Sequence, residues 1–544
     1  MIELANIQKN STESILEIGV KTCKQDLLNV IPQKYANLHR QAYIHIHDLE
    51  FYDKTYNCIG LSICDLIKDT SLQVSAVLRK LYRSIVNLTN SQSGGIGFLS
   101  FDCDMAEFRV DETDEVLIET FSNFFEDLNI YSRKGCEKPY TTLNIGYGTS
   151  VNARRITKAI LAASLKGNSE GNPFIFPNIV FKYSRDINGI ETAPNYDLFQ
   201  MALKGTANRM IPTFFNCDAS FNKNYNPNKI GIMGCRTRVI DDLYGEPSGL
   251  NRGNIACVTI NLVRLAVESN QNFQTFLKKI EALFEDCSEL LLHRFNTLCN
   301  SNSSIFALEN KLYLDSVKDR ETAFKHGTLS IGFIGLWDAL SELFNANFSE
   351  VGNLHKFHKD ALEVLRIMRH KVDSFRTEHH MNFSLLASSA EGTTGLFAQQ
   401  DYKKYGQQCK SAAKGFYSNS FHIPVDTKIS IFEKINLEAP FHAMCNGGCV
   451  SFVELDEQPS CNIEGVQKIV EYAIKSNCNY FGINFPLDKC KVCGHFGRIA
   501  DTCSSCGSSD ILRLRRVSGY LSEKATFTIG KMKELELRKA STWH

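Results

Sequence analysis

Four cysteines near the C-terminus form two CxxC pairs, and their spacing constrains the chain more than any other local feature. Cys490 and Cys493 form the first pair, nine residues intervene, and Cys503 and Cys506 form the second. Two such hooks supply the four thiolates that Zn²⁺ takes in closed, tetrahedral structural sites. A glycine follows each pair and lets the hook turn back on the metal. The spacing therefore predicts a zinc site.

Two other interpretations of this segment are a redox-active pair of CxxC motifs and a zinc ribbon that binds nucleic acid. A site closed by four thiolates leaves no open coordination position for catalysis, which favours a structural role. From Pro486 to about Ser509 the chain is short of large apolar residues. Such a module cannot be held together by a hydrophobic core, so it needs the metal as a staple.

The whole chain has the composition of an ordinary globular protein. It has 544 residues, 43% of them hydrophobic, with 60 basic and 60 acidic side chains. This zero net charge argues against a general nucleic-acid or membrane-surface partner. The N-terminus does not resemble a signal peptide, and no apolar run is long enough to span a bilayer, so we expect a cytoplasmic protein. In that reducing compartment its 19 cysteines are better suited to metal binding, redox chemistry or burial than to disulfides.

Hydrophobic periodicity predicts the fold class. Residues 273–298 and 354–375 each show the pattern of a long amphipathic helix. Short apolar, β-branched segments alternate with such helices, at residues 172–181, 254–263, 448–455 and 480–485. Long helices alternating with short buried strands indicate an α/β architecture with most of the chain in one large domain.

Thirteen residues beyond Cys506, Gly519 stands in the β-prone stretch RRVSGYL. A glycine there is normally a bulge or a turn. A glycine Cα radical, however, is stabilised by the flanking amide and carbonyl groups, and only glycine lacks the Cβ that opposes a flat centre. The RVSGY sequence resembles the glycyl-radical loop of the anaerobic, class III ribonucleotide reductases. In that family a four-cysteine zinc site lies just before the loop, as it does here.

The resemblance extends along nearly the whole chain. The matching segments are YIHIHDL (43–49), YNC (56–58), GNPF (171–174), FP (176–177), PTFFN (212–216), MGCRTR (233–238), RGN (252–254), VTINL (258–262), YSNSF (417–421) and GGC (447–449). It implies a ten-stranded α/β barrel of two parallel half-sheets with a central finger loop. We therefore expect a barrel catalytic domain over residues 1–485, a zinc module over 486–510, and a glycyl-radical loop with a C-terminal tail over 511–544.

The resemblance also assigns candidate catalytic residues. Cys235, in the GCRT segment, matches the cysteine that carries a thiyl radical; Cys257 is the competing thiol, although its strand-like surroundings favour a buried core residue. Cys58 resembles the second active-site cysteine, and a buried structural thiol is its alternative. Asn254 resembles the active-site asparagine, with Asn261 close enough to compete.

Other polar features have more ordinary explanations. His45 and His47 could bind a metal, but no third ligand is evident nearby, which favours structural hydrogen bonding. The chain has no Walker-type loop, so Gly94-Gly95 and Gly447-Gly448 are candidates for holding phosphates with backbone amides, although each pair is equally compatible with an ordinary turn.

The resemblance implies anaerobic reduction of ribonucleoside triphosphates for DNA precursor synthesis. A separate activating enzyme, using an iron–sulfur cluster and S-adenosylmethionine, would generate the radical on Gly519. Formate or a dithiol protein would supply the electrons, and dNTP or ATP effectors would act on a homodimer. The IHDL motif arrives before residue 50, so we expect a short, bacteriophage-like form without an ATP-binding cone. The main alternative is another glycyl-radical enzyme of the formate-lyase or dehydratase type.

The zinc site is directly testable by metal analysis of Cys490→Ser and Cys503→Ser. Each variant removes one of four thiolates, so we expect both proteins to lose stoichiometric zinc. Retention of one zinc per chain in both variants would contradict the predicted site.

Overall fold

Two parallel half-sheets close into a ten-stranded barrel in the described part of the chain. The computed structural model describes residues 13–132, 137–388, 392–516 and 519–543. One half contains β2 (Ile59–Leu61), β3 (Ile96–Phe98), β4 (Thr141–Ile145), β5 (Asn178–Tyr183) and β6 (Thr213–Asn216). The other contains β7 (Asn254–Asn261), β8 (Thr328–Ile334), β9 (Asn382–Ala387), β10 (Ser451–Glu454) and β11 (Tyr480–Asn484).

Three connections close the ring. β6 pairs antiparallel with β11, so the two halves run in opposite directions. Single bridges complete the circle, an antiparallel one between Gly60 and Arg252 and a parallel one between Leu386 and Gly448. β1 (Ile44–Ile46) adds an antiparallel strand to β7. The α/β class and the barrel of two parallel half-sheets expected from the sequence are confirmed.

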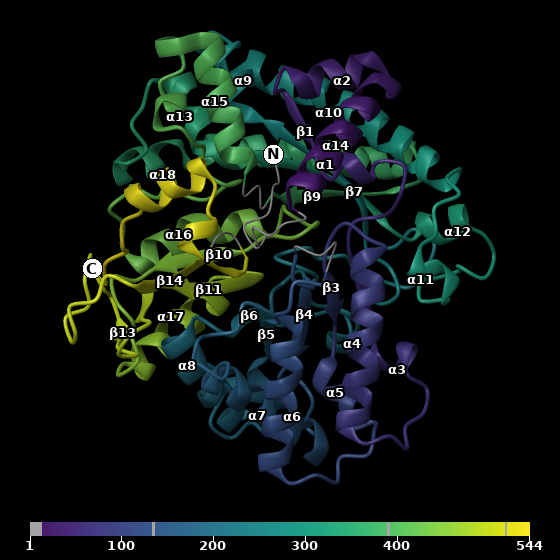
Figure 1. Cartoon of the computed structure of the whole chain (residues 1–544). Helices are drawn as coiled ribbons and strands as arrows, with labels where there is room; N and C mark the ends of the chain where they lie inside the picture. The colour runs from purple at the N-terminus through teal and green to yellow at the C-terminus, as the bar shows by residue number, and fades with distance from the viewer. Residues whose placement is uncertain (1–12, 133–136, 389–391, 517–518, 544) are drawn as a thin grey trace.

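Helices cover the outside of the barrel (Figure 1). Their bounds are α1 Glu13–Val30, α2 Gln33–Arg40, α3 Ile63–Leu66, α4 Val74–Asn90, α5 Phe101–Ala106, α6 Asp114–Leu128, α7 Val151–Lys166, α8 Tyr196–Arg209, α9 Leu262–Val267, α10 Phe273–Cys299, α11 Phe306–Glu309, α12 Arg320–Lys325, α13 Leu336–Phe344, α14 Val351–Glu378, α15 Thr393–Tyr405, α16 Ile431–His442, α17 Ile463–Lys475 and α18 Ile529–Leu537. The two predicted long helices are α10 and α14. The four predicted strands are β5, β7, β10 and β11.

The strands are buried on both faces, because helices cover the barrel outside and a loop fills it inside. All eight residues of β7 are buried. This burial explains why its sequence, NIACVTIN, reads as a near-continuous apolar run instead of alternating with polar residues. Polar side chains in such a strand must therefore form hydrogen bonds with other groups inside the protein.

The segment between β6 and β7 forms the central finger loop. Asn144 on β4 anchors it: its Nδ2 donates to the carbonyls of Phe98 (2.9 Å) and Ile232 (3.0 Å), and its Oδ1 accepts from the Ile232 amide (2.9 Å). A Cβ at Gly97 on the neighbouring strand would lie 2.8 Å from the Ile232 carbonyl oxygen. The finger therefore passes in backbone contact with the first half-sheet.

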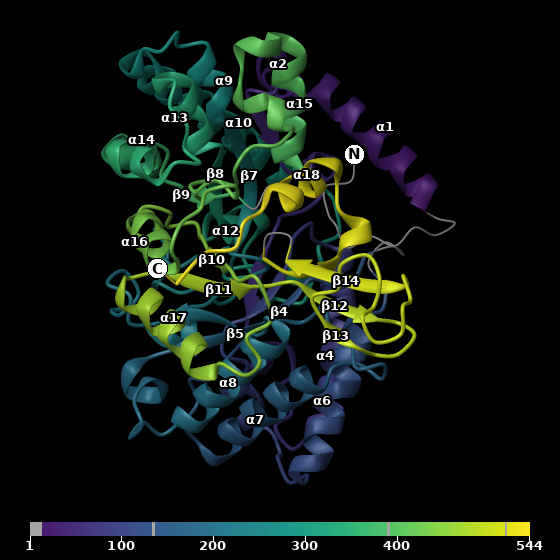
Figure 2. The ribbon, with the colours of Figure 1, turned by 90° about the vertical axis from the view of Figure 1, so that its left-hand side faces the viewer.

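The C-terminal segments form a separate sheet beside the barrel, drawn in yellow in Figure 2. Its strand order is β13 (Phe496–Gly497), β12 (Leu487–Cys490), β14 (Ile511–Arg516) and β15 (Leu521–Glu523). β12 and β14 pair directly although they lie on opposite sides of the expected 510/511 boundary. The zinc module and the strand that leads to Gly519 therefore share one sheet.

None of the described helices combines the length and the apolar character needed to cross a membrane.

The anchoring role of Asn144 predicts a stability loss in Asn144→Ala. The variant would leave the buried Ile232 amide and two carbonyls without this partner, and we expect a loss of about 2–3 kcal/mol. The shift in the urea-unfolding midpoint, measured under reducing conditions, checks it. Asn310→Ala is the matched control, because Asn310 is exposed and its side chain donates one local hydrogen bond. An equal, small shift in both variants would contradict the anchor.

Candidate active site

Cys235 lies at the tip of the finger loop. Met233 and Thr237 exchange two backbone hydrogen bonds of 2.9 and 3.2 Å and close a tight hairpin around it. Gly234 takes a positive φ of 59° in this turn, which favours glycine. The Gly234 carbonyl accepts a 2.8 Å hydrogen bond from Thr142 Oγ1 on β4. The hairpin thus presents Cys235 at a fixed point inside the barrel.

Gly519 lies directly against Cys235. A Cβ placed on Gly519 would be 2.3 Å from Cys235 Cβ and 2.8 Å from its Cα, closer than any side chain tolerates. The position therefore requires glycine for contact reasons alone. Val517 and Ser518 of the RVSGY motif lie outside the described residues. The sequence placed Cys235 and Gly519 in separate segments, and the structure brings their backbones together.

An aromatic cluster buries the residue that follows Gly519. The Tyr520 ring packs on Tyr140 with a centroid distance of 5.3 Å and on Phe176 with 5.6 Å. Tyr520 is 2% exposed. Tyr140 also lies 3.5 Å from where a Gly234 Cβ would stand. Tyr140 therefore touches both the fingertip and the glycine loop, a role that no spacing or motif in the sequence indicated.

Cys58 lies on the barrel wall beside the fingertip. Its amide donates to the Asn254 carbonyl at 3.1 Å, and a Cβ on Gly234 would stand 3.9 Å from its Sγ. The thiol donates to Asn57 Oδ1 at 2.7 Å, and Asn57 Nδ2 donates to Asp48 Oδ2 at 2.7 Å. Burial raises the pKa of Cys58 to about 12. Its thiol therefore keeps its hydrogen at neutral pH.

The two candidate asparagines have different surroundings. Asn254 donates to Ser330 Oγ at 2.5 Å, and its Oδ1 is buried with no hydrogen-bond partner among the described residues. Asn261 caps α9 by accepting from the Arg264 amide, and it donates to Asp401 at 2.8 Å. Asn254 alone therefore has an acceptor left over, next to Cys58.

The remaining candidates occupy structural positions. The neighbours closest to Gly519 are atoms of Cys235, whereas Cys257 is buried within β7. His47 Nε2 hydrogen-bonds to Thr259 Oγ1 at 2.7 Å. Among the described residues, the only cluster of three or more metal-ligating side chains consists of the four C-terminal cysteines.

The two glycine pairs do not offer free amides in the way a phosphate loop would. The Gly94 amide donates to the Asn57 carbonyl, the Gly447 amide to Leu385, and the Gly448 amide to Cys445. The three amides are therefore already occupied by backbone oxygens. Both pairs fit the ordinary-turn alternative, and Gly95 and Gly448 pack closely against the finger.

The four cysteines form a compact thiolate cluster. All four Sγ atoms lie within 4.8 Å of one another, with Cys490–Cys506 at 3.5 Å and Cys493–Cys503 at 3.6 Å. Zinc–sulfur bonds of about 2.3 Å place tetrahedral sulfurs about 3.8 Å apart, so the donor set fits zinc. The glycines that follow the hooks both adopt positive φ, 77° at Gly494 and 74° at Gly507.

Comparison with known proteins decides the family. A family model described as anaerobic ribonucleoside-triphosphate reductase matches residues 3–540. The chain belongs to this family. Relatives that carry the same name include one from Enterobacteria phage T4, 27% identical over 93% of this chain and 91% of the relative. Another, from Escherichia coli K12, is 24% identical over 94% of this chain and 78% of the relative.

Solved structures show the same fold. The anaerobic ribonucleotide reductase of Thermotoga maritima, solved in complex with dATP and CTP, superimposes with a TM-score of 0.74 at 16% identity. The alignment covers 97% of this chain and 92% of that chain. The glycerol dehydratase of Clostridium butyricum shares the fold less closely, with a TM-score of 0.59 at 10% identity, over 97% of this chain and 72% of that chain.

The raised pKa of Cys58 predicts the pH dependence of its alkylation. Only the thiolate reacts, so the labelling rate should rise about tenfold per pH unit through pH 10 without a plateau. An unperturbed thiol would level off above about pH 8.5. Iodoacetamide labelling followed by peptide mapping measures this profile. A plateau near pH 8.5 at Cys58 would contradict the predicted shift.

Proposed function

We propose that this chain reduces ribonucleoside triphosphates to deoxyribonucleoside triphosphates through a radical that passes from Gly519 to Cys235. The observation that carries the proposal is the backbone contact between these two residues inside the barrel. Glycine Cα–H and thiol S–H bonds have similar strengths, so a hydrogen atom passes reversibly across such a contact. Membership of the anaerobic reductase family supplies the substrate class.

The two thiols suit different steps of this reaction. Cys235 gives its hydrogen atom to the Gly519 radical, and the resulting thiyl takes the 3′-hydrogen of the ribose. The 2′-hydroxyl then leaves as water, while Cys58 supplies a hydrogen. The 3′-hydrogen finally returns from Cys235. The Cys235 thiyl left by this step takes its hydrogen atom back from Gly519, which restores the glycyl radical. The net reaction consumes two electrons and two protons: a dithiol protein supplies all of them, whereas formate supplies the two electrons and one proton, and the second proton comes from solvent. A Cys58 that stays protonated is suited to donating hydrogen.

Asn254 is the active-site asparagine in this proposal. Its buried Oδ1, which has no hydrogen-bond partner among the described residues, is an acceptor available to a ribose hydroxyl, and a buried acceptor of this kind gains from being satisfied. Asn261 uses its side chain to cap α9 and to bind Asp401. We therefore assign it a structural role.

The C-terminal sheet would hold the radical loop. Zinc at the four cysteines would fix the end of β12, which pairs with β14, and β14 ends three residues before Gly519. In this proposal the chain is divided by function into the barrel catalytic domain (residues 1–485), the zinc module (486–510) and the glycyl-radical loop with the C-terminal tail (511–544). A separate activating enzyme that uses S-adenosylmethionine and an iron–sulfur cluster would form the radical, because the buried glycine needs an external hydrogen-atom acceptor.

The remaining partners follow the relatives. The Thermotoga maritima protein has been solved with dATP and with CTP, so we propose dNTP and ATP effectors acting on a homodimer. The described cysteines are all free, which suits a reducing cytoplasm.

Electron paramagnetic resonance after anaerobic activation tests the proposal. We expect a doublet from the single α-hydrogen of a Gly519 radical in the wild type and no such signal in Gly519→Ala. Cys235→Ser is the second variant: it should keep the doublet and lose at least about 10³-fold in turnover of ribonucleoside triphosphates, because the abstracting thiol is gone. An absent wild-type doublet, with an activase proven on another substrate, would overturn the proposal.

The substrate separates this function from its main alternative. A glycyl-radical lyase or dehydratase would give the same doublet without consuming ribonucleoside triphosphates. Each of the four ribonucleoside triphosphates is supplied in turn, and chromatography measures the deoxynucleotide formed. This assay identifies the reaction and the preferred nucleotide.

A further inference from the structure

Arg516 is the buried anchor of the glycine loop. It is 2% exposed, and its guanidinium donates to three acceptors. Nη1 donates to the Gly519 carbonyl at 3.2 Å, Nη2 to the Met210 carbonyl at 2.5 Å, and Nε to Asn484 Oδ1 at 2.8 Å. Burial lowers the pKa of Arg516 to about 10, so it stays charged at neutral pH. This one side chain therefore ties the carbonyl of Gly519 to the barrel.

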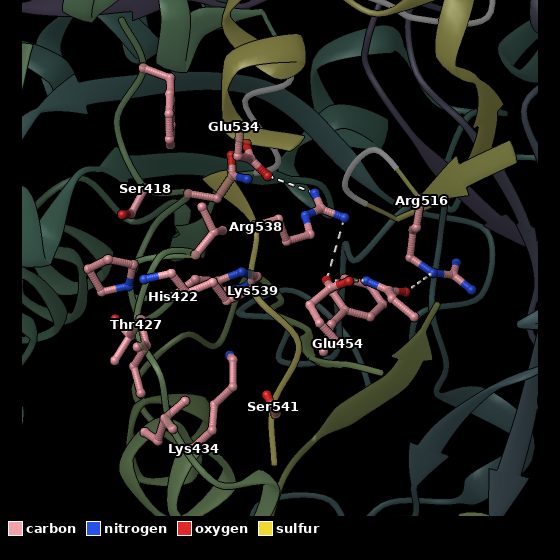
Figure 3. Close-up of a pocket in the computed structure, with 18 of the residues that line it drawn as sticks. Ser418, His422, Thr427, Lys434, Glu454, Arg516, Glu534, Arg538, Lys539 and Ser541 are labelled. Carbon is pink, nitrogen blue, oxygen red and sulfur yellow. Dashed lines mark hydrogen bonds and ion pairs between the residues drawn. The ribbon is translucent and has the colours of Figure 1, made fainter. Parts of the chain in front are cut away.

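A series of hydrogen bonds and one ion pair connects this anchor to the C-terminal helix α18. Asn484 Nδ2 donates to Glu454 Oε1 at 2.8 Å, and the same carboxylate oxygen lies 3.5 Å from Arg538 Nη1. Arg538 Nη2 donates to Glu534 Oε1 at 2.8 Å. In Figure 3, Arg538 and Glu454 lie between Glu534 at one end and Arg516 at the other, along one pocket.

Glu454 supplies the negative charge between Arg516 and Arg538 in this series of contacts. Arg516 is buried without a direct carboxylate among its hydrogen-bond partners, and Asn484 links it to Glu454. Arg538 is only 10% exposed in its side chain and faces the same carboxylate. Neutralising Glu454 would remove the carboxylate that Asn484 links to the buried Arg516, which costs free energy, while Arg538 would keep its ion pair with Glu534. Glu454 is therefore the central link.

The tail that follows Arg538 is attached to the same strand. The Ser541 amide donates to the Glu454 carbonyl at 2.7 Å, and Thr542 exchanges backbone hydrogen bonds with Ile429 and Ile431. The side chain and the backbone of Glu454 thus both engage the C-terminal segment. Through this residue the segment 529–542 reaches the glycine loop, although neither it nor Glu454 lies in the RVSGY motif.

We propose that the chain Arg538–Glu454–Asn484–Arg516 is a clamp by which the C-terminal segment positions Gly519 against Cys235. This inference rests on the proposed function for its catalytic meaning. Hydrogen-atom transfer falls steeply with distance, so a loop that spends less time in contact with Cys235 transfers the atom less often. Glu454 and Arg538 are positioning residues, since they act through Arg516.

The first experiment needs no radical. In the resting, zinc-loaded protein, Gly519 packs against Cys235 and leaves it only partly exposed, so loosening the clamp should speed iodoacetamide labelling of Cys235. We expect about a tenfold increase in Glu454→Gln and in Arg538→Met, the change that loss of one charge-assisted hydrogen bond produces in a local equilibrium. Arg538→Lys keeps a cation near both carboxylates and should stay within about threefold of the wild type.

Two controls make the labelling specific. Glu536→Gln changes an exposed glutamate on α18, and its Cys235 should be labelled at the wild-type rate. Cys287 on α10 is fully buried away from the clamp and reports general loosening. An unchanged Cys235 rate in both Glu454→Gln and Arg538→Met would overturn the clamp, and so would an equal rise at Cys287.

The second experiment measures the catalytic consequence. After activation, Glu454→Gln and Arg538→Met should show kcat about tenfold lower with KM for the ribonucleoside triphosphate within about twofold, and Arg538→Lys should recover most of kcat. An unchanged kcat in variants that label faster would overturn the positioning role. A wild type without a glycyl doublet would remove the proposed function, while the labelling result would still decide whether the clamp exists.

Discussion

The structure depends on one contact, the packing of the Gly519 backbone against Cys235. Both partners come from loops, which are ordinarily the mobile parts of a protein, and each must be held from outside. The finger is held by Asn144 and by the hydrogen bond from Thr142 to the Gly234 carbonyl. The glycine loop is held by Arg516 and by the ring of Tyr520 in its aromatic cluster. A barrel supplies walls on all sides of this contact, which an open sheet could not.

The interior of the barrel contains polar groups, and several of them are satisfied by neighbours in the barrel. The Cys58 thiol donates a hydrogen bond to Asn57, which in turn donates to Asp48. Asn254 donates its side-chain N–H to Ser330, and its Oδ1 has no hydrogen-bond partner within the described ranges of the chain. An unpaired buried acceptor is costly, and under the proposed function this atom accepts from a ribose hydroxyl.

The C-terminal sheet solves a different problem, that of fixing a short loop with little hydrophobic core. Its four thiolates can bind a metal that stabilises the sheet in place of apolar packing. The backbone pairing of β12 with β14 then restrains β14 as well. On the other side of the loop, Glu454 and Arg538 connect it to the tail. The glycine loop is thus supported both by β14, which precedes it, and by the C-terminal helix α18 and its following residues.

The sequence alone determined the α/β class, the helices α10 and α14, the thiolate set and the family, because periodicity and cysteine spacing are local properties that survive without knowledge of the fold. Motifs also picked out Gly519, Cys235, Cys58 and Asn254 as separate candidates. Only the tertiary structure decided that Cys235 lies against Gly519, that Asn261 donates to Asp401, that Tyr140 packs on Tyr520, and that Asn484 and Glu454 link Arg516 to the C-terminal segment. Those contacts join different segments of the chain, and their distances are set by how the strands close the barrel, which no local pattern encodes.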